Sequence, residues 1–234
     1  MKSIQPNIMQ HGGNQSRRDA MKMAMVSAMV PLQNTSTGSA GEKQASATSE
    51  NKPVTRPFHG LLVDNGKVYT NWGLSNSTKP AVYVEPLSDE DVQAVVKDTR
   101  RFPSPVSPVG AMLSVSPTVV NDGGTLLCTV KMDEIKGIQT DARGRKIVRV
   151  QAGCRLKKLH AWLQSKGLEI PFQAEIGEAT VGSAAVGDTK DSSLNGAGFF
   201  SAGVTGITYV NASGDIKTIT DSDDGVDFGT LAAQ

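Results

Sequence analysis

The alternation of apolar and polar positions predicts a mixed α and β domain that begins near Pro57. Short apolar runs rich in β-branched residues and bounded by turn residues predict strands. These runs lie at 80–86, 106–109, 125–130, 147–151, 207–210 and 216–219. Ala212-Ser213-Gly214-Asp215 between the last two runs predicts a hairpin, and Asp64-Asn65-Gly66 predicts another hairpin over residues 61–68.

Two further stretches repeat their apolar residues with the period of an α-helix. The first follows Ser88, which is a typical N-cap residue, and the second ends before Gly167, which is typical of the residue that closes a helix. The apolar positions are Val92, Val95 and Val96 in the first stretch and Leu156, Leu159 and Leu163 in the second.

The order of these elements predicts two α+β subdomains that meet across a cleft. The first has the order strand, helix, strand, loop, strand. The second has the order strand, helix, Gly-rich loop, hairpin. We therefore expect one subdomain over residues 57–140, a second over 145–220, and an acidic tail over 221–234.

The first 47 residues are predicted to lie outside the folded domain. Arg17-Arg18 precede a short apolar run at 23–32, a pattern that resembles the twin-arginine signal for export. The small polar residues that follow cannot bury enough apolar surface to become ordered, and Ala45-Ser46-Ala47 has the form of a cleavage site. We expect a signal and a disordered low-complexity linker over residues 1–47, and a periplasmic or secreted protein. An amphipathic N-terminal helix with a flexible linker is the alternative.

Composition and charge exclude several classes of function. Lys and Arg number 24 against 23 Asp and Glu, and they form no basic strip, so we expect no nucleic acid partner. No apolar run reaches the ~20 residues that a membrane span needs. The three histidines and two cysteines share no ligand-like spacing, so we expect no metal site.

Two segments, 108–115 and 176–193, are rich in small residues and have no clear periodicity. Small residues allow backbone N–H groups to approach a ligand closely and to form a cradle for phosphate oxygens. Neither segment has the Walker form or the Gly-x-Gly-x-x-Gly pattern, which disfavours a P-loop NTPase and a Rossmann dehydrogenase. For each segment taken alone, tight packing is the alternative.

A series of short motifs runs through residues 80–220 in a fixed order. The motifs are Pro86-x-Ser88-x-x-x-Val92, Val109-Gly110-x-x-x-Ser114, Asp122-Gly123-Gly124, Val150-Gln151-Ala152-Gly153, Lys166-Gly167-Leu168, Thr180-Val181-Gly182, 189–193 and Val204-x-Gly206. The series resembles the FAD-binding domain of the vanillyl-alcohol oxidase and p-cresol methylhydroxylase (PCMH-type) flavoproteins, especially the sugar-lactone, alditol and cholesterol oxidase branch. The resemblance implies the α+β fold of that family, with two subdomains.

The resemblance also implies FAD as cofactor, held by both small-residue segments. The first contact would come from Val109, Gly110, Ala111, Met112, Leu113 and Ser114. The second would come from Gly182, Ala185, Thr189, Lys190, Asp191 and Ser192. Many relatives link a histidine to the flavin at the position of Leu113, so we predict a non-covalent FAD. Lys190 is predicted to offset the unfavourable charge of an aspartate near the pyrophosphate.

The implied function is that of an FAD-dependent oxidoreductase, or of the cofactor-binding part of one. Such a protein takes hydride from a carbon that bears a hydroxyl group and passes electrons to an acceptor. Residues 221–234 do not resemble the substrate domain that relatives carry, so we expect a truncation as readily as a short protein, and we assign no catalytic residue. Two alternatives stay open: a truncated flavin-binding module without turnover, and an exported α+β interaction protein whose loops only pack.

Overall fold

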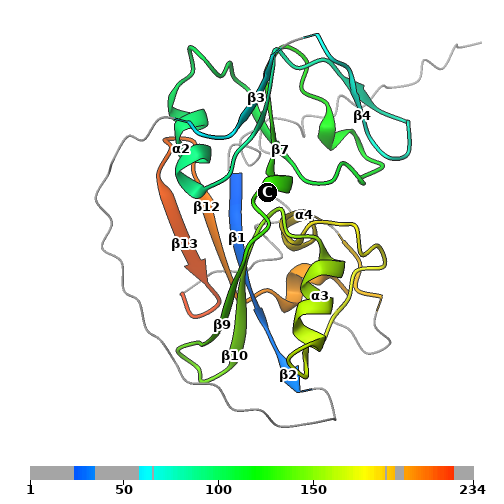
Figure 1. The fold of residues 1–234 in the computed structure, drawn as a ribbon, viewed down its shortest axis with the longest axis vertical. Coiled ribbons are helices and arrows are strands. Elements are labelled where there is room, and N and C mark those ends of the chain that lie inside the picture. Colours follow the sequence, from blue (N-terminus) through cyan, green and yellow to red (C-terminus); the bar gives the residue numbers. More distant parts are fainter. Residues whose placement is uncertain (1–23, 35–57, 65, 188, 193–197, 224–234) are drawn as a thin grey trace, which may run out of the picture.

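Two large sheets, each with helices packed beside it, make up the part of the chain that the computed structural model describes (Figure 1). The described residues are 24–34, 58–64, 66–187, 189–192 and 198–223. The first sheet lies towards the top of Figure 1 and the second towards the bottom, so the two subdomains are stacked along the long axis. The predicted class, α+β with two subdomains, is confirmed. The predicted signal and linker lie outside the described residues, except for 24–34.

The first subdomain is built on a mixed sheet with the strand order β3-β6-β8-β7. In that order the strands are Leu61–Asp64, Val82–Glu85, Thr125–Cys128 and Val106–Val109. β6 and β7 run parallel to β8, whereas β3 runs antiparallel to β6. Beside this sheet, β4 (Tyr69–Thr70) and β5 (Ser77–Thr78) form a small hairpin.

The second subdomain is built on an antiparallel sheet with the strand order β13-β12-β1-β10-β9. In that order the strands are Ile216–Thr220, Gly206–Val210, Ala24–Pro31, Lys146–Gln151 and Ile135–Thr140. Helices α3 (Leu156–Gln164) and α4 (Val181–Val186) pack on one face of this sheet (Figure 1). β11 (Leu168–Glu169) pairs with β2 (Gln33–Asn34) in a separate two-stranded sheet. Short 3-10 helices lie at Pro117–Val119, Thr129–Lys131 and Phe200–Gly203.

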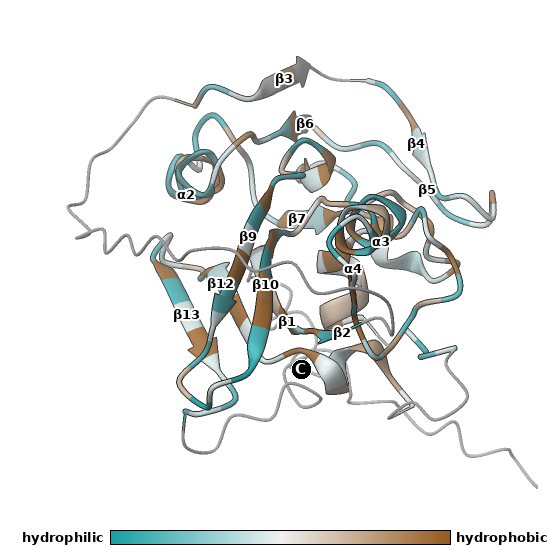
Figure 2. Ribbon diagram, turned by 60° about the horizontal axis from the view of Figure 1, so that its bottom comes forward, coloured by the Kyte–Doolittle hydropathy of each residue, from teal (hydrophilic) through white to brown (hydrophobic). Residues whose placement is uncertain are grey.

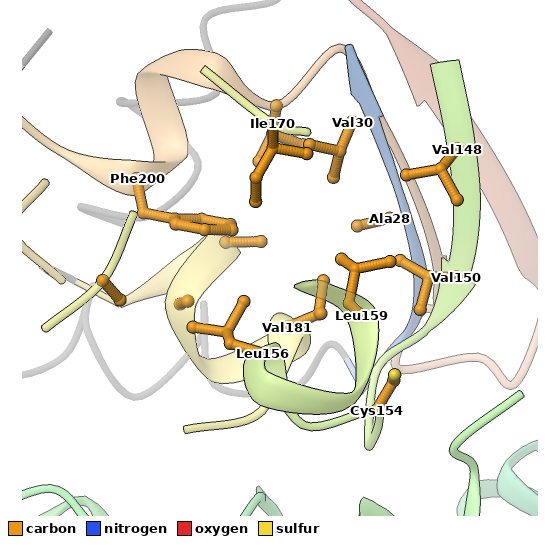
Figure 3. Close-up of a cluster of buried hydrophobic side chains, with 14 of the residues drawn as sticks. Ala28, Val30, Val148, Val150, Cys154, Leu156, Leu159, Ile170, Val181 and Phe200 are labelled. Carbon is orange, nitrogen blue, oxygen red and sulfur yellow. The ribbon is translucent and has the colours of Figure 1, made fainter. Parts of the chain in front are cut away.

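The main core lies between the second sheet and its helices. Ala28 and Val30 of β1 are fully buried and face Leu159 of α3, Val181 of α4 and the ring of Phe200 (Figure 3). Full burial of one such aliphatic side chain contributes about 1.5–3 kcal/mol. The leucine spacing that predicted α3 is therefore the spacing that fills this core.

Helix α2 (Asp89–Lys97) joins the two subdomains. Its Val92 and Val95 are fully buried in a cluster with Leu127 of β8 and Val210 of β12. The predicted cap is present, because the Ser88 hydroxyl accepts the N–H of Asp91 at 3.2 Å. Figure 2 shows the amphipathic character of the helices, with teal and brown on different sides of α2 and α3.

Two segments belong to a different part of the fold than the sequence predicted. Residues 24–31, assigned to the export signal, form β1, which pairs with β10 on one side and β12 on the other. Residues 135–140, assigned to the first subdomain, form β9 and pair with β10 in the second sheet. The apolar residues of this central strand form a run like the apolar core of a signal, so the pattern did not separate the two.

The hairpin predicted over residues 61–68 is wrong. β3 pairs with β6, which follows much later in the chain, instead of turning back on itself through Gly66. The hairpin in this region is β4–β5, whose strands are too short to show any alternation. In the second subdomain, the hairpin predicted around Ala212-Ser213-Gly214-Asp215 is confirmed as β12–β13.

Candidate functional site

A loop that leaves the carboxyl end of the parallel strand β7 is the first part of the candidate site. We call residues 110–115 the first loop. Val109 and Gly110 are buried, Ala111 to Leu113 are half-buried, and Ser114 is exposed. In open sheets, ligands commonly bind at the carboxyl ends of parallel strands. The sequence prediction of a strand at 106–109 followed by this loop is confirmed.

The carbonyl groups of the first loop are held by the protein itself. Within the described part of the chain, four of them accept a hydrogen bond: Gly110 from the Cys128 thiol (3.6 Å), Met112 from the Trp72 N–H (2.8 Å), Ser114 from the Asn71 amide (2.8 Å) and Val115 from the Asn76 amide (3.1 Å). Three of these donors belong to the β4–β5 hairpin.

The backbone N–H groups of the first loop, unlike most of its carbonyls, form no hydrogen bond to the described residues. Among the hydrogen bonds between described residues, no N–H from Gly110 to Val115 acts as a donor. Met112 has a left-handed φ of 56°, and a change of handedness along a short loop turns successive amides towards one concave side. Amides arranged in this way bind anionic oxygens.

The first loop touches the second small-residue segment through Gly110. A Cβ atom on Gly110 would lie 2.2 Å from the Thr180 hydroxyl oxygen and 2.5 Å from the Ser183 hydroxyl oxygen. Those two hydroxyl groups bond to each other at 2.9 Å. Figure 1 shows α4 next to the end of β7, where the two subdomains meet. Glycine is required here because no side chain fits between the subdomains.

The second segment, residues 176–193, differs from the first loop in the hydrogen bonds of its described amides. The N–H groups of Val181 and Gly182 donate to the carbonyls of Cys154 and Ala152, each at 2.8 Å. The Thr180 hydroxyl accepts the N–H of Ser183 at 3.4 Å. The beginning of α4 is thus bound to the turn after β10, and these amides are occupied.

Gly182 and Ala185, two predicted cofactor contacts, lie on the packed side of α4. A Cβ atom on Gly182 would lie 2.8 Å from the Cβ of Ala152, and Ala185 is fully buried. The glycine at 182 is therefore explained by close packing of α4 against the Ala152 turn. Direct contact of these two residues with a cofactor stays a prediction.

The four remaining predicted contacts, Thr189 to Ser192, bond to the chain around Gln173 and Phe200. The Thr189 carbonyl accepts the N–H of Phe200 at 2.9 Å, and the Asp191 carboxylate accepts the N–H of Gln173 at 3.0 Å. Ser192 donates its N–H to the Gln173 carbonyl at 2.7 Å. Lys190 is exposed. Among the described residues, none of these bonds reaches the first loop.

Neutral groups lie under the first loop. Burial raises the pKa of Tyr83 well above its usual range, and burial also raises the pKa of the Cys128 thiol. Tyr83 therefore stays protonated and donates to Glu85 at 2.9 Å, while its ring stacks on Tyr69 with 4.4 Å between centroids. The Cys128 thiol also stays protonated, so it can donate to the carbonyl of Gly110.

A small cationic cluster lies beside Thr180. Arg155, the bridge partner of Thr180, contacts the Glu178 carboxylate at 2.9 Å, and Lys157 contacts the same carboxylate. The Lys157 hydrogen bond and the nearby Arg155 lower the pKa of Glu178, so the carboxylate is charged. Two cations against one carboxylate leave a positive charge, which favours an anionic ligand at this junction.

Three residues of the site were not among the predicted contacts: Asn71, Cys128 as a partner of the first loop, and Ser183. Asn71 is 1% exposed, but a single buried polar residue in a turn produces no periodic signal. Cys128 is buried and free, as is Cys154, and its spacing in the sequence does not indicate its contact with the first loop. The contact of Ser183 with Gly110 joins positions far apart in sequence.

These features fit a ligand that carries a diphosphate. The N–H groups of the first loop donate to none of the described residues, four of its carbonyls are bonded to the protein, and a positive charge lies beside the junction. Gly110 keeps the two subdomains close enough for both to reach one ligand.

Comparison with known proteins identifies the class. Residues 80–220 match the family described as FAD binding domain, and this match covers more than half of the chain. The chain belongs to this family of FAD-binding proteins.

The relatives within the family include lactone oxidases. The chain is 30% identical to D-arabinono-1,4-lactone oxidase of Eremothecium gossypii over 64% of this chain and 28% of that protein. It is 27% identical to L-gulonolactone oxidase of Bos taurus over 67% of this chain and 34% of that protein. The chain thus spans about a third of the length of these relatives.

The fold is that of solved PCMH-type flavoproteins. A variant of cholesterol oxidase from Brevibacterium sterolicum superposes with a TM-score of 0.56 and 19% identity, over 75% of this chain and 36% of that chain. The family resemblance inferred from the motifs is confirmed, and FAD is the cofactor of this domain.

Proposed function

We propose that this chain is the FAD-binding part of an oxidoreductase that oxidises a hydroxyl-bearing carbon of a small substrate such as a sugar lactone. One observation carries the proposal: the first loop has four of its carbonyls bonded to the protein while its amides donate to no described residue. The substrate class is supported by relatives named as lactone oxidases.

The residues of the junction would divide the work of holding the cofactor. The amides of the first loop would bind the diphosphate, and the Thr180 and Ser183 hydroxyls would lie beside it. Lys190 would offset the charge of Asp191 at the far end of the second segment. Bound FAD supplies the hydride-accepting chemistry, and the protein supplies orientation and electrostatics.

FAD binding is tested by titration of the purified apoprotein. We expect FAD to bind and its flavin fluorescence to be quenched on binding. FMN and riboflavin lack the diphosphate and should bind at least about tenfold more weakly, a difference of about 1.4 kcal/mol. Equal affinity for FAD and riboflavin would contradict the role of the first loop. Reduction of the bound flavin by a sugar lactone without oxygen then tests the oxidoreductase. Bound flavin that stays oxidised with every sugar lactone tested would contradict that part of the proposal.

A non-covalent FAD is part of the proposal, because Leu113 has no atom that could link to the flavin. Acid precipitation of the holoprotein should leave the yellow colour in the supernatant. Colour retained in the pellet would contradict this expectation.

Export by a twin-arginine signal is a second proposal, supported by Arg17-Arg18 ahead of an apolar run. The pairing of β1 with β10 and β12 limits how the signal could be processed, because cleavage after Ala47 would remove the middle strand of a sheet. Within the described residues, no helix is both long and apolar enough to cross a membrane. Replacement of Arg17 and Arg18 by lysine should keep the protein in the cytoplasm of a bacterial host. Export that continues unchanged in the double variant would contradict the proposal.

A further inference from the structure

The β4–β5 hairpin contacts the first loop through a buried asparagine. The Asn71 side chain is 1% exposed, and its amide nitrogen donates to the Ser114 carbonyl at 2.8 Å and to the Ser75 hydroxyl at 3.1 Å. Its oxygen accepts the N–H groups of Ser75 at 3.0 Å and Asn76 at 3.1 Å. Both donors and both acceptor positions of the side chain are therefore used, which fixes the orientation of the amide.

The same hairpin holds two neighbouring carbonyls of the loop. The backbone N–H of Trp72 donates to the Met112 carbonyl at 2.8 Å, and the Asn76 amide donates to the Val115 carbonyl at 3.1 Å. Asn71 is at the centre of this arrangement, since it bonds to the loop and also fixes the turn that carries Asn76.

The direction of the carbonyls decides what the loop can bind. A carbonyl oxygen that faces a phosphate oxygen is repulsive, whereas an N–H that faces it is attractive. Met112 has a left-handed φ of 56°, a conformation that non-glycine residues seldom adopt, so the loop needs outside contacts to keep it. The bonds from the hairpin supply such contacts.

We propose that Asn71 is a positioning residue for the cofactor: by holding the Ser114 carbonyl on the hairpin side, it keeps the amides of the first loop facing the diphosphate of FAD. The proposal rests on the FAD-binding function proposed above. Asn71 acts through the loop and does not itself contact the cofactor.

Two substitutions of Asn71 test this role through the dissociation constant of FAD. Asn71→Asp keeps the shape of the side chain and its acceptor oxygen but loses both donors, and Asn71→Leu keeps the volume without any charge. We expect each to raise the Kd of FAD at least about tenfold. The Asp variant should recover affinity between pH 7 and pH 5, because a protonated carboxyl can again donate to Ser114, whereas the Leu variant should not recover.

Thr125→Val is the matched control. The Thr125 hydroxyl is fully buried and donates to the Pro103 carbonyl at 2.8 Å, so this variant also loses one buried bond to the backbone. Thr125 pairs with Val106 at the opposite end of β7 from the first loop. We expect a lower melting temperature and an unchanged Kd for FAD.

The outcomes separate the two proposals. If the wild-type protein does not bind FAD, the proposed function fails. If the wild-type protein binds FAD and the Asn71 variants bind it with an unchanged Kd, with at most the lower melting temperature expected of Thr125→Val, the role of Asn71 fails alone. Loss of affinity in the Asp variant without recovery at pH 5 would also contradict it.

Discussion

The first loop and the second segment look alike in sequence but are opposite in the structure. Both are rich in glycine, alanine and serine. In the first loop four carbonyls are bonded to the protein and no N–H donates to a described residue. At the start of α4, by contrast, the amides of Val181 and Gly182 are bonded to the turn after β10. Small residues in the second segment therefore serve the packing that brings Thr180 against Gly110, whereas those of the first loop leave its N–H groups available for the proposed ligand.

This contrast shows why composition alone does not define a phosphate site. A small residue permits close approach, but it does not decide whether a ligand or another part of the protein approaches. The deciding feature is the hydrogen-bond partner of each amide, which depends on contacts between distant parts of the chain. The contrast can be tested by substituting each segment at its closest contact.

Gly110→Val should have the largest effect on FAD binding. Its Cβ atom would collide with the hydroxyl oxygens of Thr180 and Ser183, so the two subdomains must separate. We expect the Kd of FAD to rise at least about a hundredfold, which corresponds to about 2.8 kcal/mol. Fluorescence titration measures this change.

Gly177→Ala is the control for Gly110→Val. Gly177 belongs to the second segment, and its added Cβ would lie 3.2 Å from the Cβ of Lys157, whose side chain is exposed. We expect a Kd close to that of the wild-type protein. A Gly110 variant that binds FAD as well as Gly177→Ala would end the assignment of the junction as the cofactor site.

Met112→Ile should have the next largest effect. A β-branched side chain tolerates the left-handed φ of 56° poorly, while the volume packed against the strand residues stays similar. The loop would change conformation and its amides would lose their common direction, so we expect an increase in Kd of about tenfold. Met112→Leu, which is not β-branched, should bind FAD much more tightly than the Ile variant, and equal losses would refute the conformational explanation.

Much of the fold was predictable because local patterns and tertiary contacts agree. Ser88 is the N-cap of α2, and the leucines at 156, 159 and 163 fill the main core as their spacing indicates. The misplaced segments are those whose pattern has two meanings. An apolar run such as 23–32 suits a signal and a central strand equally, and only pairing with β10 and β12 decides between them.

The site was predictable in part. Glycine at 110 and the position of the first loop followed from the motifs. The direction of the loop amides did not, because it depends on Asn71 and Asn76, which come from a hairpin of two-residue strands. The hydrogen bonds from the first amides of α4 to the Ala152 and Cys154 carbonyls were not predictable either, because these residues lie far from α4 in the chain.

Gly182→Ala should affect stability more than FAD affinity. The added methyl group would lie 2.8 Å from the Cβ of Ala152 and 2.9 Å from its carbonyl oxygen. Overpacking of this kind costs about 1–3 kcal/mol, which a denaturant titration measures as a lower free energy of unfolding. We expect the Kd of FAD for the folded protein to change less than about threefold, equivalent to about 0.7 kcal/mol. A large loss of affinity at unchanged stability would instead make Gly182 a direct contact.

Ionisation of Cys154 should have the smallest effect, confined to alkaline pH. Burial raises the pKa of this thiol to about 11. The backbone carbonyl of Cys154 accepts the N–H of Val181 at the start of α4. The unfolded chain loses this proton at a lower pH than the folded protein does, so the free energy of unfolding should fall as the pH rises from the ordinary thiol value towards about 11. At the upper end of this range the loss should be about 1–2 kcal/mol. Cys154→Ala should show a shallower decline in melting temperature over the same range, although it retains Cys128. Identical declines in the two proteins would place the alkaline sensitivity elsewhere and would leave the packing of α4 against this turn independent of the charge on Cys154.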